Sequence, residues 1–490
     1  TPSVSRSRNL ARITCTASFF RLCTLILLLQ LARVSCFSRA TLRPTASRLA
    51  FQSFRSKADA HNYEYLRRPV NPLCRPILAM TGGRLKERDA LFELVLKWIT
   101  HPEWDMTLTL RDAVAKTEHL IDEHMVNPQG SELSRKCPGV APFFTRLPLI
   151  KALDFFGSRV SVEERQYVPP TFSEVRQIFN IAQVYEMQGA IKMLTFDADD
   201  TLYEHGMDLE PGDWIVDALL QLLHSGIFVA VVTAAGYPGK PDRYASRFKG
   251  LLQKMKELNT PKEVYSRFYC VGGECNYLFR IKEGYICEQV PLEEWASDEM
   301  KSWSTEGIDK LLTLADQNLR EACDRHKLDV QFLRKERAVG CYPTQAGVRI
   351  AYETLEDVAL TLQDVLQTHP EAPKDIPFCA FNGNRDVWVD VGDKRIGIEA
   401  LQQYLKVERT QTCHLGDRFT NTGNDARARS VAMTVWVTNP LETEQYLELF
   451  LSELGTEEAK KCAAARPTGP RQGTVEWEKA QVVQKNTASQ

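Results

Sequence analysis

The chain has 490 residues, more than one ordinary domain holds, and this length predicts two or three domains. Its 43% hydrophobic and 25% charged residues are typical of a soluble globular enzyme. The formal net charge is −2, but residues 1–58 carry ten basic and no acidic side chains, so the remainder is acidic. Because nucleic-acid binding requires a basic face, we expect no nucleic-acid partner.

Residues 1–59 have the composition of a targeting segment. The apolar stretch from Leu22 to Ala32 is too short to span a membrane but fits the centre of a signal peptide. The residues after it are rich in Ser, Thr and Arg, as in organelle transit peptides. We therefore expect no stable membrane span and a cytoplasmic location, or a plastid or mitochondrial one if this segment acts in targeting.

The next part of the chain shows helical periodicity. Leu91, Leu94, Val95 and Trp98 recur at the spacing of one helix face, which predicts an amphipathic helix within residues 84–125. A second amphipathic helix is predicted over 171–188. We therefore expect a mostly helical N-terminal domain over residues 60–185.

From residue 191 the pattern changes to that of a parallel sheet. The apolar run IKMLTF ends at a group of carboxylates, a helix is predicted over 213–224, and the apolar run GIFVAVVTAAG follows. Strand, helix and strand with continuous apolar runs indicate a parallel sheet covered on both faces. Strands of the same kind return at 412–417 and 431–437.

The long insertion between the early and late strands predicts a second α/β domain. It contains helices expected over 303–324 and 354–367, an extended segment at 331–342 and strands within 377–391. The polar tail from about residue 455 is expected to be disordered. After the N-terminal domain we expect a core in two parts, residues 186–275 and 381–454. The inserted cap is expected over 276–380 and the disordered tail over 455–490.

The strongest chemical signal is the sequence FDADDTL directly after the first strand. Asp197 and Asp199 stand two residues apart at a strand end, where α/β sheets bind ligands. One carboxylate can attack phosphorus while the other transfers protons, and both can hold a hard cation. Alone, the segment also fits an acidic turn before a helix, since Asp is favoured there.

Three weaker signals follow in order along the chain. Thr233 ends the second strand, where its hydroxyl can bind phosphate oxygens, although a terminal Thr is also a common helix cap. Lys394 enters a predicted helix and is a candidate phosphate binder, although most lysines are surface groups. Asp417 ends the strand HLGD and can complete a metal site with Asp197 and Asp199.

Two polar residues follow this last strand. Asn424 and Asp425 are candidates for outer support of the metal, and both also fit helix capping. In this order, DxDxT, Thr, Lys and GD with a trailing ND resemble the four motifs of the haloacid dehalogenase superfamily. The resemblance implies an α/β fold with a haloacid dehalogenase-like Rossmannoid core, an inserted α/β cap and a mostly helical N-terminal domain. One departure is Asp200, where many members carry Gly.

Longer phrases resemble the IMP-specific 5′-nucleotidase family. They are TFDADDTLYEHG, VVTAAGY, VGGECNYLF, RKERAVG, DVWVDVGDK and GDRFTNTGNDARAR. The resemblance implies Mg²⁺-dependent hydrolysis of inosine monophosphate (IMP) to inosine and phosphate through an aspartyl-phosphate. It further implies a homo-oligomer, a tetramer in the family, and ATP as effector of the N-terminal region near PPTFSEVRQIFN.

The resemblance also assigns roles to residues. Asp197 is the nucleophile and Asp199 the acid/base, both in contact with substrate, while Thr233 and Lys394 bind phosphate. Asp386 contacts substrate from the cap side, with Arg334 or Arg337 as further partners. His205 stands where the family leads us to expect an acidic residue beside the nucleotide, so substrate preference is less constrained than the chemistry.

Two other functions fit parts of the sequence. A phosphatase or mutase acting on sugar phosphates is one, because DVWVDVGDK also resembles phosphomannomutases. A non-catalytic nucleotide-binding protein with the same fold is the other. The presence of Asp197, Asp199, Lys394 and Asp417 argues against the second alternative.

Overall fold

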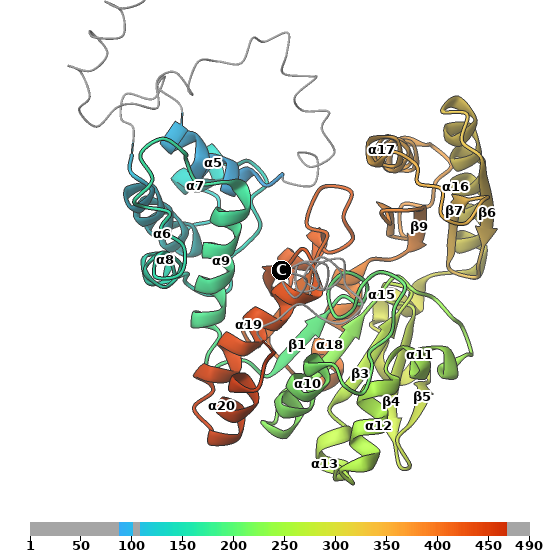
Figure 1. Cartoon of the computed structure of the whole chain (residues 1–490). Coiled ribbons are helices and arrows are strands. Elements are labelled where there is room, and N and C mark those ends of the chain that lie inside the picture. Colours follow the sequence, from blue (N-terminus) through green and yellow to red (C-terminus); the bar gives the residue numbers. More distant parts are fainter. Residues whose placement is uncertain (1–87, 101–107, 468–490) are drawn as a thin grey trace, which may run out of the picture. The chain divides into compact units, whose positions relative to one another are not determined.

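The computed structural model describes residues 88–100 and 108–467, and Figure 1 shows how their helices and strands are arranged. Two β-sheets lie within these residues, together with helices on both sides of the larger sheet. The fold is mixed α/β, as the strand and helix patterns predicted. The expected targeting segment, residues 1–59, lies outside the described residues.

Five helices lie in the described residues between residue 90 and the first strand. They bury Leu91, Leu94, Val95 and Trp98 on one face of the first helix, as the periodicity predicted. Two of them begin with a capping box, at Thr109 and Thr171. In each box the Thr side chain accepts the backbone N–H of the residue three positions later, whose side chain accepts the backbone N–H of the Thr. In the described residues these helices are α5 (Ala90–Thr100), α6 (Leu110–Val126), α7 (Glu132–Lys136), α8 (Leu149–Gly157) and α9 (Phe172–Glu186).

The larger sheet has seven strands in the order β11-β10-β1-β2-β3-β4-β5. The first five of these run parallel to one another, whereas β4 and β5 are antiparallel to their neighbours. The strands are β1 (Met193–Phe196), β2 (Phe228–Val232), β3 (Phe268–Gly272), β4 (Tyr277–Lys282), β5 (Ile286–Val290), β10 (Thr412–Gly416) and β11 (Met433–Trp436).

Both faces of the parallel part of this sheet are buried, because these strands carry apolar side chains on both sides. Val229 and Val231 of β2 belong to one hydrophobic core, and Ala230 and Val232 belong to a second. Helix α10 packs in the first core and α18 in the second. The helices around the sheet are α10 (Trp214–His224), α11 (Pro241–Arg247), α12 (Lys249–Glu257), α13 (Lys262–Tyr265), α14 (Leu292–Trp295), α15 (Asp298–Ser302), α18 (Lys394–Leu405) and α19 (Pro440–Glu453), with 3-10 turns at η2 (Arg409–Gln411) and η3 (Ala426–Ser430).

The second sheet is antiparallel, with the strand order β6-β7-β9-β8. Two long helices pack against it: α16 contacts β7, and α17 contacts β8. Figure 1 shows this sheet and its helices grouped together beyond the carboxyl end of the parallel strands. The elements are α16 (Thr305–Arg325), β6 (Val330–Arg334), β7 (Ala338–Pro343), α17 (Tyr352–Thr368), β8 (Phe378–Asn382) and β9 (Val387–Val391).

These sheets correct the expected boundaries of the insertion at 276 and 380. Strands β4 and β5 fall within 276–380, yet they pair with the core sheet through β3. Conversely, β9 lies in the range 381–454 that was expected to return to the core, but it pairs with β7 and β8. The short turn after β3 favours an antiparallel hairpin in the same sheet, a tertiary outcome that apolar patterning alone does not reveal.

The tail was expected to be disordered over 455–490, and the described part of it is instead helical. Helix α20 (Glu457–Ala464) is capped by the Thr456 side chain and buries Ala459 and Ala463. The indole N–H of Trp214 donates to the carbonyl of Cys462 at 2.9 Å. Small alanines let this helix pack closely on α10 and α19, which a composition-based expectation overlooks.

The outer edge of β11 is covered by α9. The Asn180 side chain accepts from the backbone N–H of Trp436 at 3.0 Å and donates to its carbonyl at 2.6 Å. The buried Arg176 also donates to that carbonyl and pairs with Glu442 at 2.8 Å. The amide of Asn180 therefore bonds to this edge as another strand would.

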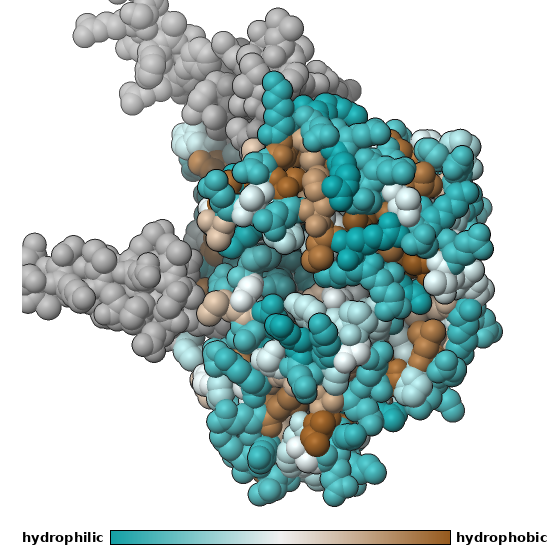
Figure 2. Space-filling model, turned by 90° about the vertical axis from the view of Figure 1, so that its right-hand side faces the viewer, coloured by the Kyte–Doolittle hydropathy of each residue, from teal (hydrophilic) through white to brown (hydrophobic). Residues whose placement is uncertain are grey.

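On the face drawn in Figure 2, hydrophilic residues cover most of the surface and hydrophobic ones form separate small areas. None of the helices in the described residues has the length and apolar character needed to cross a membrane.

Candidate active site

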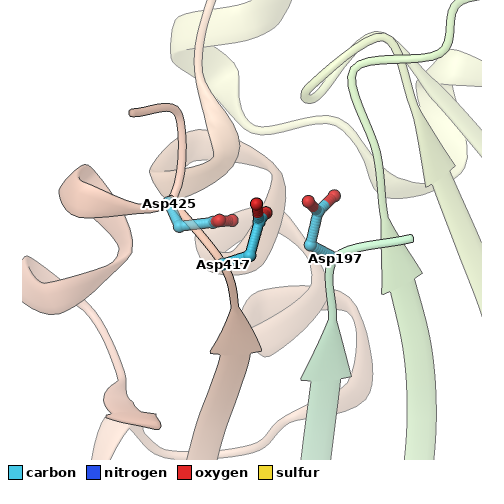
Figure 3. Close-up of side chains that lie close together, drawn as sticks. All are labelled: Asp197, Asp417 and Asp425. Atoms are coloured by element: carbon cyan, nitrogen blue, oxygen red, sulfur yellow. The ribbon is translucent and has the colours of Figure 1, made fainter. Parts of the chain in front are cut away.

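Three carboxylates meet at the carboxyl end of the parallel strands (Figure 3). Asp197 directly follows β1 and Asp417 directly follows β10, and these strands are hydrogen-bonded neighbours with Phe196 opposite Leu415. Asp425 points toward them from the segment after β10. One oxygen from each of the three lies within 4.8 Å of the others. Adjacent parallel strands thus deliver the first two acids, as the sequence pattern predicted.

Lys394 is the buried counter-charge of this cluster. It begins α18, has no exposed surface, and its ammonium lies 2.7 Å from Asp197 and 2.6 Å from Asp425. Burial alone would lower the pKa of Lys394, but the charges of Asp197 and Asp425 outweigh burial and hold the pKa above its usual value. The lysine therefore stays charged between these two acids.

The cluster carries more negative than positive charge. Burial raises the pKa of Asp197 and of Asp417 because their charged forms are removed from water. Burial would also raise the pKa of Asp425, but Lys394 and the hydrogen bond from His414 hold it below its usual range. Asp417 has one buried oxygen without a hydrogen-bond partner. A hard divalent cation fits such a site, because it supplies positive charge and accepts carboxylate oxygens as ligands.

Asp199 was predicted to share the metal with Asp197 and Asp417, and the structure does not bring its carboxylate into this cluster. Asp425 joins the other two instead. The chain turns sharply after Ala198, with Asp200 at φ 57°, and the Asp199 carboxylate accepts the backbone N–H of Gly206 at 2.7 Å. Gly adopts a left-handed backbone at no steric cost, which explains why many proteins with the same motif carry Gly at the position of Asp200.

A cavity of about 180 Å³ opens beside Asp197. Asp199, His205, Thr233, Asp386 and Asn424 all line it, so the structure brings these predicted residues together. The Thr233 hydroxyl accepts the backbone N–H of Ala235 at 3.1 Å. Lys394, Asp417 and Asp425 lie behind this wall rather than in it. The cavity is lined by residues of both sheets, with Phe381 and Trp388 from the second.

The structure does not place Arg334 or Arg337 on the cavity wall. Arg334 instead pairs with Asp309 of α16 at 2.7 Å, and Arg337 lies 3.7 Å from Glu336. Two cationic side chains do line the cavity: Arg418, which directly follows Asp417, and Lys335, whose ammonium lies 4.3 Å from the centre of the Trp388 ring. Lys335 follows the last residue of β6, and strand alternation would place Lys335 and Arg337 on the same face, so RKER carries no signal that singles out Lys335.

Two buried acids near the cavity were also missed from the sequence. Glu274, in the turn between β3 and β4, accepts from the Asn424 amide at 2.8 Å and has a second oxygen without a partner. Asp390 of β9 is buried, and neither of its oxygens has a hydrogen-bond partner. Burial raises the pKa of Asp390 to about 8, although the charge of Lys335 opposes this.

Residues 106–447 match the sequence model of the family described as IMP-specific 5′-nucleotidase. This chain belongs to the IMP-specific 5′-nucleotidase family. The family lies in the haloacid dehalogenase superfamily, in agreement with the order of the four motifs.

Individual relatives agree with the family match. The IMP-specific 5′-nucleotidase 1 of Neurospora crassa is 37% identical over 360 residues, which cover 69% of this chain and 83% of that protein. The Plasmodium falciparum protein of the same name is 35% identical over 345 residues, covering 68% and 76%. The solved structure of an IMP-bound P. falciparum IMP-nucleotidase variant has a TM-score of 0.68 and 31% identity, covering 77% of this chain and 98% of that one. An ATP-bound structure of the same enzyme has a TM-score of 0.65 and 32% identity, covering 76% and 87%.

The buried Asp390 predicts a pH-dependent stability. Its folded-state pKa of about 8 lies above the usual value of 3.8, so the folded state binds this proton more tightly than the unfolded state. Its contribution to stability is therefore fully present below about pH 4 and is lost as pH rises through about 8. Asp390→Asn should gain melting temperature relative to wild type as pH rises from 5 to 9. The exposed control Asp375→Asn should show a constant difference, and a constant difference for Asp390→Asn would contradict the assignment.

Proposed function

We propose that this chain is a Mg²⁺-dependent phosphohydrolase that converts IMP to inosine and phosphate through an aspartyl-phosphate. The observation that carries the proposal is the meeting of Asp197, Lys394 and Asp417 at one sheet edge, in a member of this family. The adjoining cavity, lined by acidic, basic and aromatic side chains, offers room for the nucleotide.

The proposed chemistry begins with attack of an Asp197 oxygen on phosphorus. The bond from phosphorus to the nucleoside oxygen breaks, and Asp199 gives that oxygen a proton, so inosine leaves. Asp199 then takes a proton from water, whose oxygen attacks phosphorus, and the bond to Asp197 breaks to release phosphate. Lys394 and Thr233 hold phosphate oxygens during both steps.

Two of the acids would hold the metal. Asp197 and Asp417 offer carboxylate oxygens, with the unpartnered oxygen of Asp417 available as a ligand. When bound, Mg²⁺ would offset the negative charge that carboxylate and phosphate bring together. Asp425 has a different role, because its oxygens already accept from Lys394, His414 and the backbone N–H of Arg418. It orients Lys394.

The second sheet and its helices would act as the cap that selects the nucleoside. Lys335, Phe381, Asp386 and Trp388 reach the cavity from this domain, opposite Asp197. The aromatic rings suit a nucleobase, and Lys335 provides a hydrogen-bond donor. Burial raises the pKa of Asp386, so this carboxyl group is protonated more readily than an exposed one. The core would handle phosphate and the cap the nucleoside.

Regulation by ATP is proposed through a second cavity. It measures about 390 Å³ and lies between α5, α9 and the end of the core sheet, lined among others by Phe92, Asn180, Arg429 and Trp436. The indole N–H of Trp436 donates to the carbonyl of Asp417 at 3.0 Å. A ligand that shifts Trp436 would therefore shift a metal-binding acid. Homo-oligomeric assembly, tetrameric in the family, remains a prediction of the sequence.

The test of function is phosphate release from a panel of IMP, AMP, GMP and hexose phosphates. Wild type should prefer IMP. Asp197→Asn should lower turnover by at least about a thousandfold while the protein stays folded, because the nucleophile is lost. Asp217→Asn, on the surface of α10, is the control. Preference for hexose phosphates would favour the sugar-phosphate alternative, and an active, folded Asp197→Asn would refute the mechanism.

Removal of divalent metal should abolish turnover, and added Mg²⁺ should restore it, because the crowded carboxylates otherwise repel the phosphate. Asp417→Asn should raise the Mg²⁺ concentration needed for half-maximal activity by at least about tenfold. The measurement is a Mg²⁺ titration of initial rate at fixed IMP. Full activity after thorough removal of metal would contradict the proposal.

Substrate selection should depend on Lys335. Lys335→Met should lower kcat/KM for IMP by about tenfold or more, as expected for loss of a charge-assisted contact, with a smaller effect on a small generic phosphate ester. Arg334→Met removes a neighbouring cation that pairs with α16 and should leave both values close to wild type. Equal losses on both substrates would argue against a role in nucleoside recognition.

ATP should change the apparent affinity for IMP by about fivefold or more, the lower range of measured coupling energies. Saturation curves at several ATP levels, with free Mg²⁺ held constant, measure this. Trp436→Phe keeps the ring but loses the bond to Asp417, and it should reduce the response. Trp98→Phe should retain the response, since Trp98 makes no such bond. Superimposable wild-type curves would eliminate the regulatory proposal.

A further inference from the structure

A line of buried polar side chains leads away from the nucleophile into the core sheet. Thr195 of β1 lies 2.9 Å from Nδ1 of His414 on β10, and Nε2 of His414 lies 2.9 Å from Oδ1 of Asp425. The same oxygen of Asp425 lies 2.6 Å from Lys394, which reaches Asp197. Thr195, His414, Asp425 and Lys394 are all fully buried. Buried polar groups of this kind stabilise one arrangement only when every member is satisfied.

Each contact in this line joins a possible donor to a possible acceptor. A carboxylate can only accept, so Nε2–H of His414 donates to Asp425. Nδ1 of the ring pairs with the Thr195 hydroxyl at 2.9 Å, and that hydroxyl also donates to the carbonyl of Cys413 at 3.4 Å. The other Asp425 oxygen accepts the backbone N–H of Arg418 at 2.9 Å. Thr195 therefore sets the ring orientation, and the ring sets the carboxylate.

Holding Asp425 in place has a consequence for Lys394. If Asp425 could rotate away, the ammonium would keep only Asp197 as an anionic hydrogen-bond partner and would pair fully with the nucleophile. Such a pair stabilises the ground state of the carboxylate and opposes its attack. With Asp425 fixed, the ammonium of Lys394 is shared between two acids and pairs less fully with the nucleophile.

We propose that His414 and Thr195 are positioning residues for phosphoryl transfer, acting through Asp425 on the placement of Lys394. This inference rests on the proposed phosphohydrolase function, although not on IMP as the substrate. Neither residue lines the cavity, and their side chains are linked to Asp197 only through Asp425 and Lys394. Their loss should affect the rate of the chemical step rather than substrate affinity.

A purely structural role is the alternative. His414 packs edge-on against Phe419, with ring centres 6.2 Å apart, and a buried His can serve packing alone. In that case substitutions would lower the melting temperature without a specific loss of kcat in the folded protein. The two roles are separated by variants that keep shape but lose the hydrogen bond, or keep the bond but lose shape.

The first experiment compares Thr195→Val with Thr195→Ser. Val keeps the shape and loses the hydroxyl, whereas Ser keeps the hydroxyl and loses a methyl group. We expect Thr195→Val to lower kcat by about tenfold, the lower range for groups that orient a ligand from outside the site, with KM within about twofold. Thr195→Ser should keep kcat within about twofold even if its melting temperature falls. Equal kcat for the two variants would overturn the proposal.

The second experiment tests the link through Asp425. Gln at position 414 can extend an amide N–H to Asp425, whereas Asn is one methylene shorter, so His414→Gln should retain more kcat than His414→Asn. Adding Thr195→Val to Asp425→Asn should cause no further loss, because the acid through which Thr195 acts is already gone. Multiplicative losses in the double variant would overturn the proposal.

All variants are measured on the full chain with IMP and with a small generic phosphate ester. Wild type that hydrolyses the ester but not IMP would refute the proposed substrate, and the comparison of Val with Ser on the ester would still decide the positioning role. Wild type that hydrolyses neither substrate would refute both the proposed function and the inference. Wild type that hydrolyses IMP, with Thr195→Val equally fast, would refute only the positioning role.

Discussion

The candidate active site depends on the burial of one cation. Lys394 has no exposed surface, and a buried ammonium is stable only where opposite charges and hydrogen bonds hold it. Asp197 and Asp425 provide these at 2.7 and 2.6 Å. Three segments far apart in sequence, β1, the start of α18 and the segment after β10, must therefore assemble before the charges balance. The site and the core of the protein form together.

The catalytic face was predictable because parallel strands follow a simple rule. Asp197, Thr233 and Asp417 each follow a buried apolar strand, and the carboxyl ends of neighbouring parallel strands meet at one edge of the sheet. The α/β class follows from the same runs. Asp425 was expected only as outer support, because its approach to Lys394 depends on the path of the segment after β10, which carries no periodic signal.

The cap was less predictable because its features depend on which strands pair. The sequence does not say whether a strand pairs with β3 or with β7, so the expected boundaries at 276 and 380 differ from the observed sheets. The segment RKER contains three basic residues, and the sequence does not say which of them reaches the cavity. The pairing of β6 with β7 and the contact of Arg334 with α16 place Lys335 at the cavity and Arg334 away from it. Contacts distant in sequence decide both outcomes.

The cover over β11 has a consequence for the solution behaviour of the protein. A strand at the end of a sheet offers free N–H and C=O groups to which strands of other molecules can add. Here Asn180 and Arg176 of α9 occupy those groups at Trp436. Helix α9 thus protects the sheet from edge-to-edge aggregation, in addition to lining the cavity proposed for regulation. A shortened enzyme that lacked α9 would need another cover for this strand.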